Sequence, residues 1–197
     1  MKTQFTNVYQ FKITLDGIKP SIWRRIQVPE TYSFWDLHVA IQDAMGWTDS
    51  HLHQFELTNP KTGEAVEIGI PDEEWDAEAL AGWDVKIADY FSTKNPTARY
   101  VYDFGDNWEH TLNLEKILPR DEKVEYPICL DGKRACPPED CGGLPGYEAL
   151  LINLSDPDSE EYEETIEWLG GDFDPEYFDP LDVYFDDPDE RRKFVLG

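Results

Sequence analysis

Apolar and polar residues alternate along several stretches of the chain, and this period of two predicts β-strands that bury one face. The alternating stretches span residues 9–15, 22–28, 51–57, 99–104 and 108–117. The first two are separated by a segment at 16–20 and the last two by one at 105–107, both containing the Gly and Asp that tight turns favour. The chain is therefore expected to contain two β-hairpins.

One stretch after the first hairpin has the apolar spacing of an amphipathic helix. Apolar residues recur there at helical intervals: Leu37, Ala40, Ile41, Ala44 and Met45. Ser33 and Asp36 resemble a capping box, with Asp in place of the usual Glu or Gln, and Gly46 supplies a stop. A helix between Ser33 and Gly46 is therefore predicted. The less regular stretch 72–80 is also interpreted as helical.

The last third of the chain predicts short helices. One is expected over 146–154, and a second after Asp156, with Pro157 at its first position. Asp174 and Pro175 repeat this opening for a third, brief helix. Hairpins with helices gathered after them predict an α+β fold, in which helices pack on one face of an antiparallel or mixed sheet.

The chain is expected to form a single domain over residues 1–197, because it shows neither an internal repeat nor a flexible linker. Its core is expected over 6–180. The segment 118–145 is rich in Pro, Gly and Cys and is predicted to be a long irregular loop. Loops of this length are uncommon unless something pins them or they carry function, so this loop is a candidate functional segment.

The chain carries 42 Asp and Glu residues against 17 Lys and Arg, which gives a formal net charge of −25. Its apolar content of 40% places this charge on a folded body rather than on a disordered chain. The segment 156–190 contains no Lys or Arg, so an acidic C-terminal face is expected. Direct binding to nucleic acid is disfavoured, because phosphates are contacted mainly by Lys and Arg.

The sequence also bears on the cellular compartment. No apolar run approaches the roughly 20 residues that a membrane-spanning helix needs. The N-terminus leads directly into a strand-like pattern, without the apolar run of a signal peptide. Three cysteines, an odd number, suit a reducing compartment. The cytoplasm is therefore the predicted location, and the oligomeric state stays open.

The three cysteines lie close together in the sequence, at Cys129, Cys136 and Cys141. Three thiolates held by prolines and glycines could supply three ligands of a tetrahedral zinc site. His51 is the candidate for the fourth ligand, with His53 and His110 as alternatives. No C-x-x-C pair occurs, so reduced thiols packed under a Pro-rich loop are the other interpretation.

The turn of the second hairpin contains several ionisable groups. Two facing strands could bring His110, which follows this turn, beside His53. The candidate catalytic residues are His53, Asp103, Asp106, Glu109 and His110. Such a set, together with His51, could hold a divalent cation or transfer protons. The hairpin turn by itself also requires Gly, Asp and Asn, which favours a structural role for these residues.

Several long motifs resemble those of one known family. They are Asp16–Pro29, Gly46–Phe55, Tyr102–His110, Cys129–Gly143 and Gly170–Pro175. Together, from about Tyr9 to Phe178, they resemble the plasmid Ri open-reading-frame-three-like family, which includes TnpR-like passenger proteins of insertion elements. The resemblance implies an α+β fold and no established activity. A resolvase, which the name TnpR suggests, needs a basic phosphate-binding pocket, whereas the seven arginines here are scattered in a negative field.

Three functional hypotheses follow. The first is a binding or adaptor module of plasmids or mobile elements, with or without a structural metal, that meets a protein partner through its acidic or aromatic surface. It is favoured because it needs no catalytic constellation. The second is a metal-dependent hydrolase acting on a phosphodiester. The third is an acidic mimic of nucleic acid that binds a basic protein.

Overall fold

A computed structural model describes residues 4–71 and 79–196, and it centres on an eight-stranded sheet. The strands are β1 (Asn7–Leu15), β2 (Ile22–Pro29), β3 (His53–Thr58), β4 (Ala65–Gly69), β5 (Leu80–Ala81), β6 (Thr97–Tyr102), β7 (Trp108–Pro119) and β8 (Ile128–Lys133). Their order is β5-β4-β3-β6-β7-β1-β2-β8, and neighbours are antiparallel except for β4 and β5. Both predicted hairpins, β1–β2 and β6–β7, are present, and the mixed sheet confirms the α+β class.

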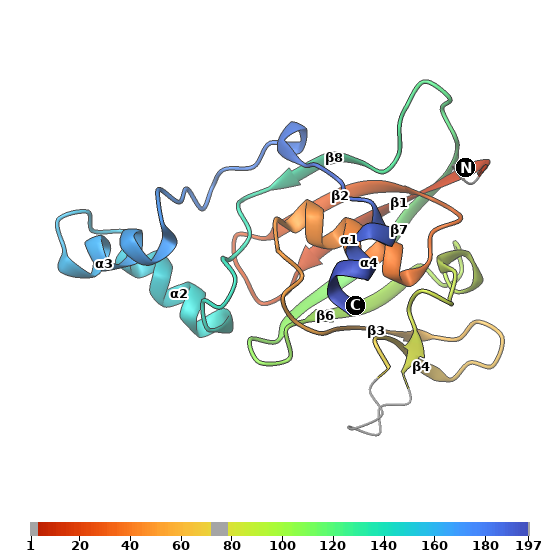
Figure 1. The fold of residues 1–197 in the computed structure, drawn as a ribbon, viewed down its shortest axis with the longest axis horizontal. Helices are drawn as coiled ribbons and strands as arrows, with labels where there is room; N and C mark the ends of the chain where they lie inside the picture. Colours follow the sequence, from red (N-terminus) through yellow and green to blue (C-terminus); the bar gives the residue numbers. More distant parts are fainter. Residues whose placement is uncertain (1–3, 72–78, 197) are drawn as a thin grey trace.

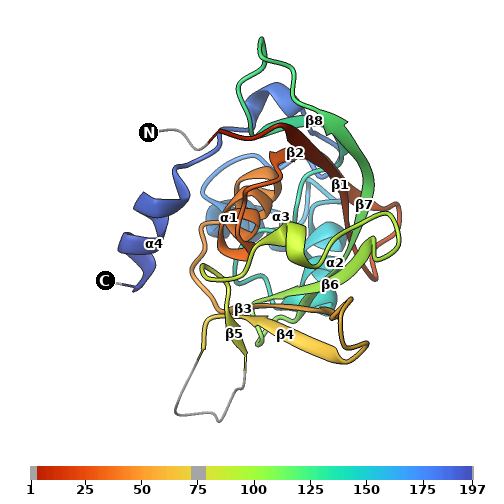
Figure 2. The ribbon, with the colours of Figure 1, turned by 90° about the vertical axis from the view of Figure 1, so that its right-hand side faces the viewer.

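The described helices lie on the concave side of the sheet and beyond its end. They are α1 (Phe34–Met45), α2 (Gly143–Asn153), α3 (Glu160–Leu169) and α4 (Pro188–Leu196), with 3-10 turns η1 (Ile87–Asp89) and η2 (Pro180–Asp182). The sheet curves round α1, and α4 lies on the open side of that curve (Figure 2). Helices α2 and α3 form an arm that extends away from the sheet (Figure 1). In the described part of the chain, none of these helices has the length and apolar character needed to cross a membrane.

Helix α1 begins and ends where the sequence predicts. The Ser33 hydroxyl accepts a hydrogen bond from the Asp36 amide, and the Asp36 carboxylate accepts one from the Ser33 amide. This reciprocal pair satisfies two amides that a helix start leaves open. Gly46 ends the helix at φ 90°, a left-handed conformation that glycine adopts without strain.

The two faces of the sheet differ as the alternation predicts. On the concave face, alternate residues of the long strands are buried, and most of these residues are apolar. Examples are Phe11, Ile26, Phe55 and Leu112. The convex face carries ion pairs between strands, such as that of Arg25 on β2 with Glu115 on β7, which reaches across β1. The core therefore lies between the concave face and α1.

Arg24 is a charged residue on this largely apolar concave face. Its guanidinium is buried and donates to the backbone oxygens of Ala44, Trp23 and Lys133. The Phe178 ring lies 3.8 Å from the guanidinium carbon. Arg24 thus satisfies a carbonyl in the last turn of α1 and joins this helix to β2 and to the edge strand β8.

Some predictions for the second half of the chain are wrong. The segment 118–145 is not an irregular loop throughout, because β8 within it pairs with β2 as an edge strand. Helix α3 begins after Ser159, whose hydroxyl accepts the Tyr162 amide, rather than after Asp156.

The two Asp-Pro steps form turns instead of helix starts. The carboxylates of Asp156 and Asp174 each accept the amide two residues further on, which closes an Asx-turn. No helix follows Asp174 directly; η2 begins only at Pro180. Of the predicted helix over 72–80, residues 72–78 lie outside the described part of the chain.

Candidate functional site

Three of the sequence motifs meet at the end of the sheet from which the arm extends. The Trp47 indole nitrogen donates to the backbone oxygen of Pro137 at 2.9 Å. The Thr48 amide and the Tyr102 hydroxyl both donate to Oε1 of Glu139, at 2.8 and 3.0 Å. These contacts fasten the Cys-containing segment to the exit of α1 and to the end of β6.

His51, Asp103 and Asp140 form a partly exposed cluster at this junction, with Asp103 buried and Asp140 exposed, and we call it the rim group. The His51 Nε2 atom lies 2.9 Å from Asp140 Oδ1 and 3.7 Å from Asp103 Oδ2. One ligand atom from each residue lies within 4.8 Å of the others, a spacing that would allow them to share a cation. The sequence predicted His51 and Asp103 as candidates but not Asp140.

A second cluster, His38, Asp49 and His53, lies in the interior between α1 and β3, and we call it the buried group. His38 bonds through Nε2 to Asp49 Oδ1 at 2.8 Å and through Nδ1 to the Tyr100 hydroxyl at 2.9 Å. The rings of His38 and His53 are stacked, with centroids 3.4 Å apart. Its ligand atoms also lie within 4.8 Å of one another.

Burial sets the protonation of the buried group. Loss of hydration on burial lowers the pKa of His38, and the nearby positive charge of Arg191 lowers it further. Burial also lowers the pKa of His53, and the neighbouring His38 adds to this effect. Both pKa values lie well below the ordinary 6.5, so both imidazoles are neutral at pH 7. Burial raises the pKa of Asp49 to about 6, against the attraction of His53 and Arg191.

The other predicted catalytic residues do not join either cluster. Strand β6 lies between His53 and His110, because His53 is opposite Tyr102 while His110 is opposite Tyr100. The expected juxtaposition of these two histidines is therefore wrong.

Two carboxylates of that set are engaged elsewhere. Glu109 pairs with Arg99 on the convex face at 2.7 Å. The Asp106 carboxylate accepts the Gly142 amide at 3.1 Å, so it holds the start of α2. Each therefore has a structural partner.

The three cysteines do not form a shared ligand group in the described part of the chain. The Cys136 sulfur is buried 3.7 Å from the Met45 sulfur, and the Cys129 sulfur lies 3.8 Å from the Asp131 oxygen. Among the described residues, the groups of three ligands close enough to share an ion are the rim and buried groups, and neither contains a cysteine. Burial raises the pKa of Cys136 and of Cys141 to about 12, which favours thiols over thiolates. Zinc at the cysteines stays a prediction without geometric support.

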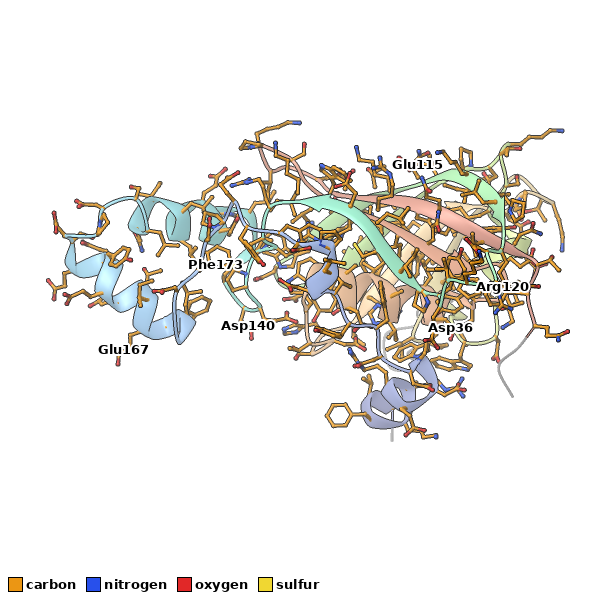
Figure 3. All side chains as sticks on the ribbon, turned by 90° about the horizontal axis from the view of Figure 1, so that it is seen from above. Asp36, Glu115, Arg120, Asp140, Glu167 and Phe173 are labelled. Atoms are coloured by element: carbon orange, nitrogen blue, oxygen red, sulfur yellow. The ribbon has the colours of Figure 1, made fainter. Side chains whose placement is uncertain are left out.

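A groove of about 420 Å³ lies between the Cys141 segment and the two helices of the arm, and we call it the arm groove. Its lining includes Asp140, Leu150, Asn153, Glu161, Glu164 and Trp168, and no Lys, Arg or His of the described ranges 4–71 and 79–196 belongs to it. The Trp168 side chain is 54% exposed. Asp140 belongs to both the rim group and the arm groove, and it lies at the base of the arm (Figure 3).

Sequence reasoning missed His38 and Asp49. His38 lies on the helix predicted between Ser33 and Gly46. A usable signal was present, since His38 and Gln42 are four residues apart and place two polar side chains on a helix that is otherwise largely apolar. Asp49 carries no comparable signal, because its position depends on the chain's path after Gly46.

Comparisons with known proteins agree over most of the chain. The family described as plasmid pRiA4b ORF-3-like protein matches residues 7–182. The uncharacterized protein y4hQ of Sinorhizobium fredii (strain NBRC 101917 / NGR234) is 39% identical over 165 residues, which cover 83% of this chain and 81% of that protein. A crystal structure of MM3350, a protein of unknown function from Methanosarcina mazei Go1, matches with a TM-score of 0.86 and 56% identity, over 92% of this chain and 100% of that chain. The family match includes both clusters and ends before α4.

Proposed function

The chain belongs to the plasmid pRiA4b ORF-3-like family, and from that premise we propose that it is an adaptor of a plasmid or mobile element, which binds a basic segment of another protein in the arm groove. The observation that carries the proposal is the lining of this groove. Asp140, Glu161 and Glu164 line the groove together with the exposed Trp168, and among the described residues no Lys or Arg does.

The groove chemistry suits a lysine or arginine side chain. A cation over an indole ring is attracted by the ring's negative face, by about 0.5–2 kcal/mol depending on hydration. Carboxylates beside the same ring add charge-assisted hydrogen bonds. In the described part of the chain, neither Glu161 nor Glu164 forms an ion pair within 4 Å, so both remain available to a partner.

Part of the acidity of α3 has a structural reason. Glu160, Glu161 and Glu163 lie in its first turn, where negative charge interacts favourably with the helix dipole. Glu164 has no such reason, and it is three residues from Glu161, a spacing at which like charges repel. A bound cation would relieve that repulsion, which favours binding over a solely structural role.

The surroundings strengthen the attraction at longer range. The segment 156–190, which includes α3 and leads back toward α4, has no Lys or Arg. A single-sign field of this kind speeds the approach of an oppositely charged partner and weakens with salt.

The test uses a fluorescent peptide of alternating Lys and Ala as the probe and measures its anisotropy over a range of salt concentrations. We expect Trp168→Ala and Glu164→Gln to weaken binding about tenfold each, whereas Tyr184→Ala and Glu190→Gln, an exposed aromatic and an exposed acid outside the groove, leave it nearly unchanged. Equal losses in all four variants would mean diffuse attraction to an acidic surface, as the nucleic-acid mimic requires, and would contradict the groove.

The rim group favours a second candidate function, metal-dependent hydrolysis of a phosphodiester. His51 is partly exposed between two carboxylates, an arrangement that suits a divalent ion or general acid–base work. Hydrolysis of an activated phosphodiester with Mn²⁺, lost in His51→Gln and retained in His110→Gln, would support it. The acidic field around the site opposes it, because it repels the substrate.

A further inference from the structure

The buried group contains polar atoms without hydrogen-bond partners. Both ring nitrogens of His53, Oδ2 of Asp49 and Nη1 of Arg191 are buried and have no hydrogen-bond partner within the described residues, although the last two atoms face each other at 3.8 Å. His53 is only 2% exposed. An unpaired buried polar atom costs roughly 1–3 kcal/mol, and buried polar groups in native proteins usually have a partner, which can be an ordered water or an ion.

The donor set indicates which ligand would satisfy these atoms. Two imidazoles and one carboxylate present two nitrogens and one oxygen within 4.8 Å. This combination is typical of sites for Zn²⁺, Fe²⁺ and related divalent transition metals, which take neutral imidazole as a ligand. Hard ions such as Ca²⁺ prefer oxygen alone.

Residues around the buried group already orient its ligands. Tyr100 bonds Nδ1 of His38, which leaves Nε2 facing Asp49. Gln42 donates to the same tyrosine hydroxyl and accepts the Asp49 amide. Metal-binding histidines usually have such a partner on the second ring nitrogen, and the partner fixes the ring and its tautomer.

The charge near the site also favours a cation. Arg191 of α4 contacts three carboxylates, with distances of 2.9 Å to Asp43 and 3.8 Å to Asp49, and with Asp186 as the third. One guanidinium among three ionised carboxylates leaves a formal charge of −2, which one divalent ion would neutralise. The Trp35 indole donates to Pro188 and helps to hold α4 over the site.

We propose that His38, Asp49 and His53 bind one divalent transition-metal ion, with α4 closing the site and Arg191 as the neighbouring cation. The ion would lie between His38 Nε2 and Asp49, with the ring proton of His38 on Nδ1, where it would be donated to the Tyr100 hydroxyl, and would also take one nitrogen of His53 and Oδ2 of Asp49. The two stacked rings would tilt toward a common point. The proposal is independent of the arm groove.

The experiment adds Co²⁺ to chelator-treated full-length protein and records visible absorption. We expect one equivalent to bind with weak d–d bands, with no thiolate charge-transfer band, and with displacement by Zn²⁺. His53→Gln should abolish binding, Tyr100→Phe should weaken it about 10–100-fold, and His51→Gln, which removes the rim group, should leave it unchanged. Arg191→Met should tighten it about tenfold, because a neighbouring positive charge is removed.

Three results would overturn the proposal. Binding lost in His51→Gln but kept in His53→Gln would place the ion at the rim group. A thiolate band that disappears in Cys136→Ser would place it at the cysteines. Failure of both the wild type and Arg191→Met to bind stoichiometrically would exclude a site altogether. Circular dichroism checks that each variant is folded, and Asp49→Asn replaces His53→Gln as the ligand variant if the latter unfolds.

Discussion

The imidazole ring of His38 lies parallel to that of His53, with centroids 3.4 Å apart and planes inclined by 8°. His38 comes from α1 and His53 from β3, so the stacked pair joins the helix to the sheet. Two imidazolium ions at this distance would repel each other strongly, so the rings cannot both be charged, and burial disfavours the charged form of each ring. Hydrogen bonds from the surrounding polar residues hold His38 in place.

Tyr100→Phe tests that network. The hydroxyl accepts from Gln42 and bonds His38, and its loss leaves two buried polar groups without a partner. We expect the free energy of unfolding to fall by about 2–3 kcal/mol. Urea denaturation measures it, with Tyr184→Phe, whose side chain is exposed, as the control that should change it little. Equal stability of the two variants would mean that water replaces the hydroxyl at no cost.

The sheet and α1 were predictable because their signals are local. Alternation of period two fixes which face of β1, β2, β6 and β7 is buried, and the Ser33–Asp36 capping box fixes where α1 begins. The α3 start was mispredicted for an equally local reason. Asp156 and Ser159 are both good N-cap residues, and the side chain of Asp156 closes a turn instead.

The buried group was not predictable in the same way. Its residues become neighbours only when the curved sheet closes on α1, and Arg191 reaches it from a helix more than 130 residues away in sequence. The edge strand β8 was missed because Pro, Gly and charged residues surround a short alternation, and its pairing with β2 decides its conformation. Long-range contacts of this kind leave no periodic pattern.

Arg24 gives a second prediction. Arg24→Met keeps the aliphatic stem but removes the donors to Ala44, Trp23 and Lys133. We expect a loss of about 2–4 kcal/mol in unfolding free energy, since buried carbonyls lose charged partners. Arg24→Lys should not restore it, because an ammonium cannot reproduce the planar fork.

The neighbouring Arg25 provides the matched control. Its side chain is on the convex face and pairs with Glu115 near solvent. Arg25→Met should therefore lower the unfolding free energy by about 1 kcal/mol or less in the same urea titrations. If Arg25→Met lowered the unfolding free energy as much as Arg24→Met does, the burial of Arg24 would not explain the effect of its substitution.

Gly146→Ala tests how the arm is attached. A Cβ atom at Gly146 would lie 1.8 Å from the Cys141 backbone oxygen, so the start of α2 would have to move. Because both residues line the arm groove, we expect lost affinity for the Lys-Ala peptide as well as about 2 kcal/mol or more of lost stability. Anisotropy and thermal melts measure the two effects. Gly63→Ala, where no atom lies within 4 Å but φ is +77°, should cost about 1 kcal/mol and leave peptide binding intact.

Glu30 predicts a pH dependence of stability. Burial acts to raise its pKa, but hydrogen bonds from Asn7 and Thr6 outweigh this and lower it to about 2, against 4.5 ordinarily. A folded pKa below the unfolded one means that the unfolded chain binds the proton first, so the stabilisation is complete above pH 4.5 and is lost as the pH falls toward 2.

The variant that isolates this effect is Glu30→Gln. At pH 7 it should be less stable than the wild type by about 1–2 kcal/mol, because a neutral amide accepts weaker hydrogen bonds than a carboxylate. Urea denaturation from pH 7 to pH 3 should show this difference constant above about pH 5 and shrinking below 4.5, whereas Glu122→Gln, at an exposed position, shows little difference throughout. A gap that stays the same down to pH 3 would show that the side chain acts through its shape and not through its charge.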